Sequence, residues 1–401
     1  MGVESFPMSS VAPAAADPLG LSSSGWENLV ASWDLPRYRG RQIFEALHRR
    51  GARSYGAIHE IPADLRERLS RQMPLALPEV VRREAAIDGS AKYGLRFADG
   101  ALVEAVFMPG DRESARVNEF ADARVAPAGA ASPESELRGP RGASRSSERF
   151  TVCLSSQTGC AVDCAFCVTG RLGAGRNLSA GEILGQLYAV LDAEGRSWEG
   201  LRVVFMGMGE PFLNLRGVLP ALDLLFERIS PRRVTVSTSG ITPAFAEFAA
   251  RTRRPNLAVS VNAADEETRT KLMPITRTHS LASLLAAMKA WPLEPRRRIT
   301  VEYVLIAGIN DAPADAGRLA RLLSGIPVKI NVIPLNEDSD YLPGWKRPDE
   351  AAIERFVERL AASHLTTTVR RSKGPDARAA CGQLKGRTED PRRVPRRPGS
   401  C

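Results

Sequence analysis

From residue 150 onward, the chain alternates short apolar runs with longer helical patterns. The apolar runs, each of strand length, cover residues 150–154, 202–206, 234–238, 257–261, 299–306 and 328–333. Strands that are separated by helices cannot be joined by tight turns, so they pair in parallel with the helices packed on the sheet. Six such units predict an α/β fold in the form of a partial (β/α)6 barrel, because a closed ring needs eight. A run at residues 366–370 extends the predicted sheet.

One of the intervening helices shows the pattern in detail. Residues 181–192 carry their apolar side chains on one face, as a helix packed on a sheet requires. Ser179 and Glu182 stand three residues apart at its start, the spacing of a capping box. The sequence therefore predicts a helix over residues 181–192 with a capping box at its start.

The first third of the chain has a different pattern. Residues 38–50 predict an amphipathic helix within a small basic helical region. Residues 92–97 and 101–108 are strand-like and flank Asp99 and Gly100, a dipeptide typical of hairpin turns. We therefore expect a small N-terminal helical accessory domain that is followed by a β-hairpin.

These patterns divide the chain into six parts. They are a disordered leader (1–24), an N-terminal helical domain (25–78), a β-hairpin segment (79–110), a flexible insertion (111–148), a core (149–376) and a C-terminal segment with a basic tail (377–401). The insertion consists of small, polar and charged residues with few large apolar groups. Such a composition cannot compensate for the conformational entropy that ordering would cost.

Composition excludes several classes of protein. The 401 residues with 43% hydrophobic content can bury a large core, and six cysteines in this length do not make a disulfide scaffold. No run of about 18 apolar residues predicts a membrane span, so we expect a cytoplasmic protein without a membrane partner. A net charge of +9 favours a polyanionic partner such as a nucleic acid.

Three closely spaced cysteines lie in one predicted loop directly after the first strand of the core. Cys160, Cys164 and Cys167 can bind three irons of a [4Fe–4S] cubane and leave the fourth iron open to a small ligand. The alternative is a structural zinc site, which needs four ligands. The remaining cysteines are candidates for that fourth ligand: Cys153, Cys381 and Cys401.

Polar groups and glycines follow four of the predicted strands at the point where each strand ends. The candidate cofactor-binding residues at these ends are Gly209, Glu210, Ser237, Ser260, Val261, Asn262 and Asn336. In a barrel of parallel strands, functional groups gather at the C-terminal ends of the strands. Each motif alone is ordinary loop chemistry. Together, beside the cysteine loop, they predict a cradle for the amino-acid moiety and the ribose of S-adenosylmethionine.

Several long motifs resemble those of the RlmN/Cfr family of radical S-adenosylmethionine RNA adenine methyltransferases. The motifs are CLSSQTGCAVDCAFCVTG (153–170), FMGMGEP (205–211) and AACGQL (379–384). The resemblance covers about residues 26–386, apart from the insertion, and residues 35–44 resemble the family's N-terminal RNA-binding domain. It implies the radical S-adenosylmethionine barrel as the fold of the core.

The resemblance also implies a reaction. It is methylation of carbon 2 of an adenosine in the peptidyl-transferase region of 23S ribosomal RNA, and in some transfer RNAs, with a [4Fe–4S] cluster on the three cysteines. Two S-adenosylmethionine molecules are used per turnover: one methylates Cys381, and a radical from the second removes a hydrogen from that methyl group. The resulting methylene radical adds to the base, and a transient disulfide between Cys381 and Cys153 releases the product. An electron donor such as flavodoxin and a monomeric enzyme are further expectations.

Glu104 is the remaining catalytic candidate. It interrupts an apolar strand, and a carboxylate in apolar surroundings is suited to act as a base. In the resembling family, the glutamate five residues before the counterpart of Pro109 is the proton acceptor. The alternative is a charge that prevents pairing at the edge of a sheet.

The chain departs from the family in two places. The insertion at residues 111–148 separates Glu104 from the cysteine loop, and Asn262 stands where many members carry histidine. An asparagine can still form a hydrogen bond with a ribose hydroxyl.

Basic side chains mark the expected RNA contacts. Those on the N-terminal helices are Arg37, Arg39, Arg41, Arg49, Arg50 and Arg53, and those near Cys381 are Arg370, Arg371 and Lys373. Beside a site that must accept an adenine flipped out of its stack, they predict phosphate contacts.

The sequence leaves three alternatives to this interpretation. A close variant methylates carbon 8 of adenosine, and a radical enzyme with another substrate would share the same core. A protein of another class, a zinc-dependent RNA-binding protein without catalytic activity, would use the cysteines as structural ligands.

Overall fold

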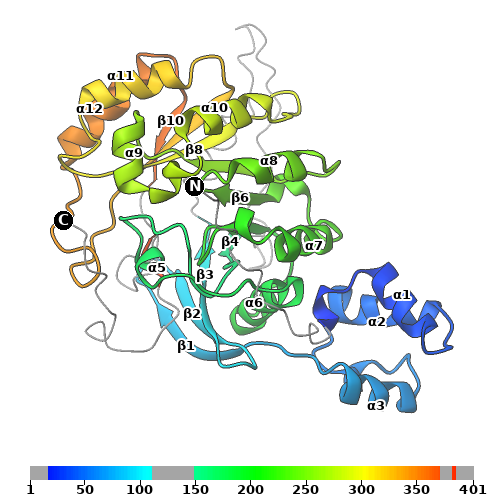
Figure 1. Cartoon of the computed structure of the whole chain (residues 1–401). Coiled ribbons are helices and arrows are strands. Elements are labelled where there is room, and N and C mark those ends of the chain that lie inside the picture. The colour runs from blue at the N-terminus through cyan, green and yellow to red at the C-terminus, as the bar shows by residue number, and fades with distance from the viewer. Residues whose placement is uncertain (1–16, 111–148, 371–381, 385–401) are drawn as a thin grey trace, which may run out of the picture.

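The computed structural model describes residues 17–110, 149–370 and 382–384, and its described strands form one mixed sheet (Figure 1). The strands follow one another across this sheet in chain order. They are β1 (Glu79–Ala85), β2 (Ala91–Arg96), β3 (Leu102–Pro109), β4 (Phe150–Cys153), β5 (Leu201–Phe205), β6 (Val234–Thr238), β7 (Asn256–Ser260), β8 (Ile299–Leu305), β9 (Val328–Pro334) and β10 (Thr367–Val369).

Strand direction divides the sheet into two parts. β1 to β4 pair antiparallel, and β4 to β10 pair parallel. The predicted parallel sheet is therefore confirmed, and the predicted hairpin is present as β2 and β3. β1 was not predicted. It is charged and half exposed, a composition that protects an edge strand but hides the alternation by which strands are recognised.

Helices connect the parallel strands and cover one side of the sheet. They are α5 (Val168–Arg171), α6 (Ala180–Glu194), α7 (Leu215–Phe226), α8 (Thr242–Ala249), α9 (Glu266–Leu272), α10 (Leu281–Ala290), α11 (Pro313–Leu322) and α12 (Glu350–Ala361). Helix α6 begins where the sequence predicts, because Ser179 and Glu182 form the expected capping box. Among these described residues, no helix is long and apolar enough to cross a membrane.

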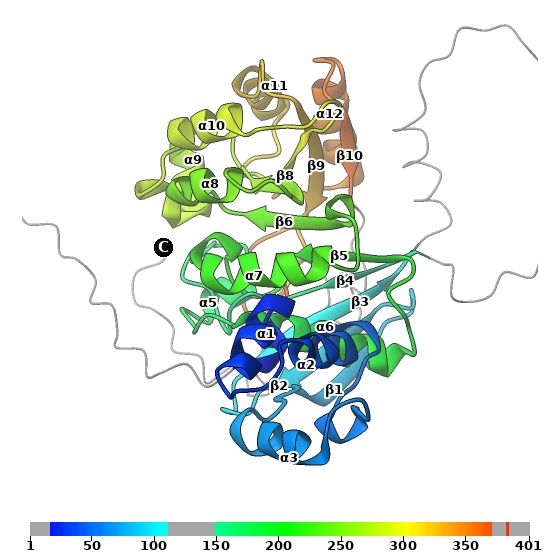
Figure 2. The same ribbon diagram turned by 90° about the vertical axis from the view of Figure 1, so that its right-hand side faces the viewer.

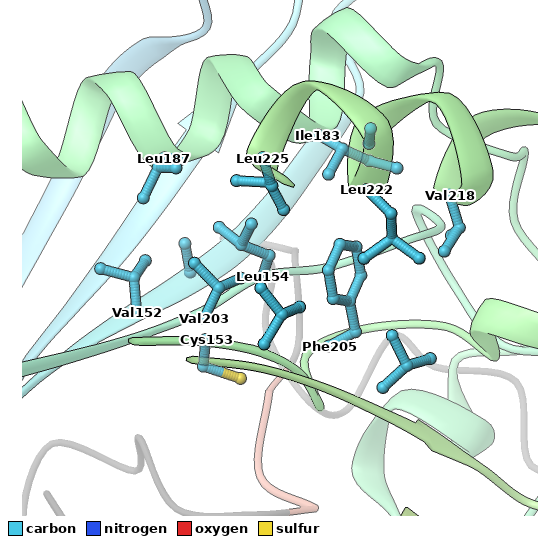
Figure 3. Packing of buried hydrophobic residues seen from close by; sticks show 14 of the residues in the cluster. Val152, Cys153, Leu154, Ile183, Leu187, Val203, Phe205, Val218, Leu222 and Leu225 are labelled. Atoms are coloured by element: carbon cyan, nitrogen blue, oxygen red, sulfur yellow. The ribbon is translucent and has the colours of Figure 1, made fainter. Parts of the chain in front are cut away.

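The two faces of the central strands have different chemistry. Figure 3 shows Val152 and Leu154 of the β4 region packed against leucines of α6 and α7, whereas Cys153 between them points away from these helices. Each apolar side chain buried in this way stabilises the fold by about 1.5–3 kcal/mol. We call the face of the sheet that carries Cys153 the inner face.

The N-terminal helices α1 (Ser23–Ala31), α2 (Tyr38–Phe44) and α3 (Ala63–Gln72) lie at the α6 end of the molecule, far from α11 and α12 (Figure 2). Helix α2 continues as a short π-helix, Glu45–Arg49. From it, His48 Nδ1 lies 2.7 Å from the hydroxyl of Tyr188 in α6. Arg53 binds both carboxylate oxygens of Asp192 in α6, at 2.7 and 3.1 Å.

The predicted disordered leader extends too far into the chain. Residues 17–24 are part of the folded structure: Pro18 and Leu19 are buried, and Ser22 caps the helix that begins at Ser23. The side chain of Asp17 accepts a hydrogen bond from the backbone of Gly181, at 2.8 Å, in the first turn of α6. The first turn of a helix has N–H groups without partners in the helix, and an acidic side chain can accept hydrogen bonds from them. The contact of Asp17 with the first turn of α6 therefore explains why residues 17–24 are folded.

We expect the histidine at the contact between α6 and the N-terminal helices to weaken the fold in mild acid. Burial, followed by the charges of Arg53 and Arg228, lowers the pKa of His48 from 6.5 to about 4. Below pH 6.5 the unfolded chain gains a proton that the folded chain does not accept until the pH approaches 4. Between pH 7 and pH 5, this difference should lower the free energy of unfolding by about 2 kcal/mol.

Thermal unfolding across this pH range measures the effect. His48→Gln should remove this part of the pH dependence, and His59→Gln, which replaces an exposed histidine of the same region, should keep it. The same pH dependence in His48→Gln as in the unmutated protein would contradict the prediction.

Candidate active site

A pocket lies at the carboxyl ends of the parallel strands. Its empty volume is about 940 Å³, with the open mouth included. The lining residues that the sequence predicted are Cys160, Cys164, Cys167, Gly209, Glu210, Ser237, Ser260, Asn262 and Asn336. Residues from separate strands and the cysteine loop are thus brought to one place, as parallel strand order predicts.

The cysteine loop is held by backbone hydrogen bonds on several sides. Cys160 N donates to Gly173 O at 2.9 Å, and Ala165 N donates to Leu272 O at 2.8 Å. Cys167 precedes the short helix α5, whose first residue, Val168, donates to Gly382 O at 2.7 Å. The loop is therefore fixed by the rest of the fold and does not depend on a ligand for its path.

Burial and mutual repulsion disfavour the thiolate forms of Cys160 and Cys164. Burial, with the charge of Cys167 next, raises the pKa of Cys160 to about 12. Burial also raises the pKa of Cys164 well above its ordinary value, and Cys167 and Cys160 add to the effect. These two thiols need a bound cation to become thiolates, since metal coordination deprotonates them.

The donor set fits an iron–sulfur cubane. Within residues 17–110, 149–370 and 382–384, no three His, Cys, Asp or Glu side chains converge on the position of one metal ion. A cubane binds its thiolates to separate irons, so three cysteines of one pocket wall would suffice to hold it. Cys160, Cys164 and Cys167 are the residues that would hold it.

Glu210 organises the rim of the pocket. One carboxylate oxygen accepts from Phe212 N at 2.9 Å, and the other accepts from Ser239 N and Ser239 Oγ at 2.7 and 2.6 Å. Burial raises the pKa of Glu210, and these hydrogen bonds oppose the increase. The carboxylate thus fixes the loop that follows β6, where the side chain of Thr238 adds a further hydrogen bond.

Arg269 is a buried cation below the rim that the sequence analysis missed. It is fully buried, and burial lowers its pKa to about 10. Its guanidinium donates to Ser239 O, Ser260 O, Val261 O and Thr276 Oγ1 at 2.7 to 3.2 Å. Arg269 therefore joins the ends of β6 and β7. The polar pattern of α9 gave no sign of burial, because the partners lie outside this helix, at strand ends and in loops whose positions the sequence does not show.

Two of the predicted cofactor-binding residues have structural partners. Asn262 has a φ of +58°, a left-handed conformation that asparagine and histidine adopt more readily than most residues, and this explains the replacement of histidine. Its side-chain oxygen accepts from Val304 N at 2.8 Å. Val261 is buried and is not among the lining residues, so its contribution is the backbone carbonyl that Arg269 binds.

Glu302 is a second buried carboxyl group in the pocket that the sequence analysis missed. It pairs with Ser260 across β7 and β8, and one of its oxygens accepts from Asn331 Nδ2 at 2.7 Å. Burial is the main cause that raises its pKa, and the charge of Arg370 opposes it. The sequence of the strand at residues 299–306 could have indicated this carboxyl group. Strands of a parallel sheet are mostly apolar on both faces, so a glutamate within one is unusual.

Glu104 and Cys153 lie on neighbouring strands and do not line this pocket. Cys153 pairs with Val106 in the register of β3 and β4, and Ser155 Oγ donates to Glu104 O at 2.6 Å. The expected apolar surroundings of Glu104 are wrong: its carboxylate lies 2.6 Å from Arg82 Nη2 and 3.7 Å from Lys92 Nζ. Lys92 comes from the adjacent strand β2 and Arg82 from β1 beyond it, which the alternation of β3 alone cannot show.

Cys381 lies outside the described residues, but the segment directly after it is described. Gly382 lines the pocket with the three cysteines. Thr169 Oγ1 donates to Leu384 O at 2.7 Å, and Gln383 Nε2 donates to Glu337 O at 3.1 Å. This segment thus packs against α5, at the cysteine loop.

The predicted RNA-contact arginines fall into two groups. Arg53 binds Asp192 and lies over the ring of Tyr188, so it holds the N-terminal helices on α6. Arg37, Arg41, Arg49 and Arg50 are exposed, whereas Arg39 is half-buried and donates to Gln42 Oε1 and Glu60 O, both at 2.9 Å. Arg371 and Lys373 lie outside the described residues, and Arg370 lines the pocket.

Known proteins resemble this chain over most of its length. Residues 154–320 match the Radical SAM superfamily. The dual-specificity RNA methyltransferase RlmN of Anaeromyxobacter dehalogenans is 40% identical over 91% of each chain. The probable dual-specificity RNA methyltransferase RlmN of Koribacter versatilis is 42% identical over 88% of this chain and 97% of its own.

A solved structure has the same fold. The crystal structure of a radical SAM methyltransferase from Sphaerobacter thermophilus aligns with a TM-score of 0.77 and 36% identity, over 92% of this chain and 99% of its own. These likenesses favour the iron–sulfur interpretation of the cysteines over the zinc alternative.

We expect the pocket cysteines to be required for iron binding and Cys153 not to be. Cys164→Ala removes a ligand from the pocket wall, so the protein purified without oxygen should lose most of its iron, sulfide and brown colour. Cys153→Ala, the matched control, changes a residue outside the pocket lining and should retain them. Iron and sulfide analysis with visible absorption measures both variants. Stoichiometric zinc in the unmutated protein would contradict the assignment.

Proposed function

Because the chain belongs to the RlmN family of dual-specificity RNA methyltransferases, within the radical SAM superfamily, we propose that it methylates carbon 2 of an adenosine in 23S ribosomal RNA and in transfer RNA. The observation that carries the proposal is the single pocket that three cysteines, a polar rim and Gly382 line together. It offers a cluster site, a cofactor site and a place beside Cys381 at one point.

The chemistry of the substrate explains why the enzyme needs both a cluster site and a cofactor site. Carbon 2 of adenine lies between two ring nitrogens and is not a nucleophile, so it cannot displace the methyl group of a sulfonium directly. When bound, a [4Fe–4S] cluster supplies the electron that cleaves S-adenosylmethionine to a hydrogen-abstracting radical. The protein must therefore hold the cofactor, the methyl carrier and the base within reach of one another.

The pocket rim supports binding of S-adenosylmethionine. Glu210 offers a carboxylate to the ammonium group, and Ser237, Ser260 and Asn336 offer hydrogen bonds to the ribose and the amino-acid moiety. The backbone of Gly209, with a φ of +95°, allows close approach of the ligand. We assign Asn262 and Val261 the role of shaping this rim through their backbone and side-chain contacts.

Three residues carry the methyl transfer in this proposal. Cys381 takes a methyl group from one S-adenosylmethionine, and a second molecule serves the radical step, so two are used per turnover. Glu104 accepts the proton that leaves carbon 2. Cys153 attacks the sulfur of Cys381, so that an S–S bond forms and the S–C bond to the methylated base breaks; the product methyl carbon takes the thiol proton, and the one electron released would pass to the oxidised cluster. The position of Cys153 on the inner face, next to the strand of Glu104, supports this division of roles.

The remaining parts of the chain have supporting roles. We propose that the core, residues 149–376, acts as a partial (β/α)6 barrel, and that the N-terminal domain, residues 25–78, binds RNA through its exposed arginines. Residues 79–110 carry Glu104, and residues 377–401 carry Cys381. We further propose a cytoplasmic monomer that takes electrons from a donor such as flavodoxin.

We expect the product to be 2-methyladenosine. Ribosomal and transfer RNA from a deletion strain should lack this nucleoside, and expression of the chain should restore it, as measured by mass spectrometry of nucleosides. Restoration of 8-methyladenosine would replace the assignment by the carbon-8 reaction. Unchanged 2-methyladenosine in the deletion strain would remove the RNA assignment.

The two catalytic cysteines should give different defects. Cys381→Ala removes the methyl carrier, so it should abolish methylation of RNA while cleavage of S-adenosylmethionine continues. Cys153→Ala leaves the carrier without its resolving thiol, so it should trap a covalent adduct between protein and RNA. Denaturing gel electrophoresis and product analysis measure these outcomes, and full turnover in either variant contradicts the assigned role.

A further inference from the structure

We propose that Arg82 is a positioning residue for the carboxylate of Glu104, which it reaches across the backbone of Gly94. Arg82 Nη2 lies 2.6 Å from Glu104 Oε1, although a strand separates the two residues. This proposal rests on the function proposed above, in which Glu104 accepts the proton from carbon 2. It adds the group that determines where this carboxylate points.

A β-bulge places Arg82 on the required face. Val80 pairs with Leu95, and the register then shifts so that Arg82 pairs with Gly94. Without the extra residue, Arg82 would pair with Tyr93 and project from the opposite face. The bulge instead aligns Arg82, Gly94 and Glu104 in one row across β1, β2 and β3.

The glycine in the middle of this row leaves a path for the guanidinium. A Cβ atom at Gly94 would lie 3.3 Å from Arg82 Cβ and 3.7 Å from Arg82 Nε. The Arg82 side chain therefore runs directly over the position where any other residue would place its side chain. Glycine inside a strand often marks such a close approach.

Neighbouring charges make the position of Glu104 depend on Arg82. Lys92 Nζ lies 3.7 Å from Glu104 Oε1 but 2.8 Å from Glu84 Oε2, and Arg82 Nε lies 3.2 Å from Glu84 Oε1. Glu104 is fully buried and Lys92 nearly so. If Arg82 is removed, Lys92, which lies two residues from Gly94 on β2, remains 3.7 Å from Glu104 Oε1, and the carboxylate is drawn toward β2.

Such a displacement would affect one chemical step. After the methylene carbon has bonded to carbon 2, the C2–H bond breaks, its proton passes to a Glu104 oxygen, and its electron pair remains in the ring. A base must be aligned with the proton that it removes, and a positioned base contributes a factor of about 10²–10⁴ to the rate. Arg82 touches neither the RNA nor the cofactor in this scheme and acts through Glu104.

The test uses RNA with deuterium at carbon 2 of the target adenosine. In Arg82→Ala, 2-methyladenosine formation should fall by a factor of about ten or more, because the base loses its alignment. Slow proton removal then becomes rate-limiting, so the deuterium isotope effect should increase relative to the unmutated enzyme. Methylation of Cys381, measured by peptide mass, and cleavage of S-adenosylmethionine should remain unchanged.

Three further variants separate positioning from a general loss of structure. Arg82→Lys keeps a cation that can reach Glu104 and should recover much of the rate. Gly94→Val blocks the path of the arginine and should reproduce both the slower rate and the larger isotope effect. Arg96→Ala, the matched control, removes an exposed cation of β2 that pairs with Glu79, and should behave as the unmutated enzyme.

The outcomes distinguish this inference from the proposed function. If the unmutated enzyme forms 2-methyladenosine and Arg82→Ala does so at the same rate and with the same isotope effect, the positioning role is wrong. A slower Arg82→Ala with an unchanged isotope effect and reduced methylation of Cys381 also overturns it, since the defect is then structural. If the unmutated enzyme forms no methyladenosine, the proposed function itself fails.

Discussion

Parallel pairing of strands β4 to β10 is the constraint on which the site depends. Successive parallel strands end at the same edge of a sheet, so loops that are far apart in the sequence meet there. Glu210 after β5, Ser239 after β6 and Asn262 after β7 become neighbours for this reason. The antiparallel strands β1 to β3 join the same sheet because β3 pairs with β4. The inner face of the sheet is therefore continuous from the parallel strands to Glu104.

Buried charge explains why this edge is extensively hydrogen-bonded. A buried ion that lacks partners costs several kcal/mol, roughly, even after the protein relaxes around it. Glu210 meets this cost with three hydrogen bonds, and Arg269 does so with four that extend to two strand ends. The same bonds fix the rim before any ligand arrives, so little reorganisation remains to be done on binding.

Local sequence patterns were enough to predict most of the helices and strands. Features that depend on contacts between segments far apart in the fold could not be predicted in this way. The capping box of Ser179 and Glu182 gave the start of α6, and the strand ends gave six of the residues that line the pocket. Arg269 escaped notice because α9 is polar except for its last residue, a leucine, and the partners of Arg269 lie outside this helix at strand ends and in loops. The order of residues 17–24 escaped notice because it depends on Asp17 meeting the first turn of α6.

The surroundings of Glu104 could not be predicted from the alternation of polar and apolar residues along the strands. A strict period of two along β1 places Arg82 on the face of Tyr93, so sequence alone separates the arginine from the carboxylate that it binds. One extra residue in the strand reverses that assignment, and no composition signal marks a bulge in so charged a segment. Gly94 was the available clue, because a glycine inside an apolar strand weakens it unless another group must pass. A glycine in the strand next to a buried carboxylate is therefore a reason to look for a cation on the strand beyond.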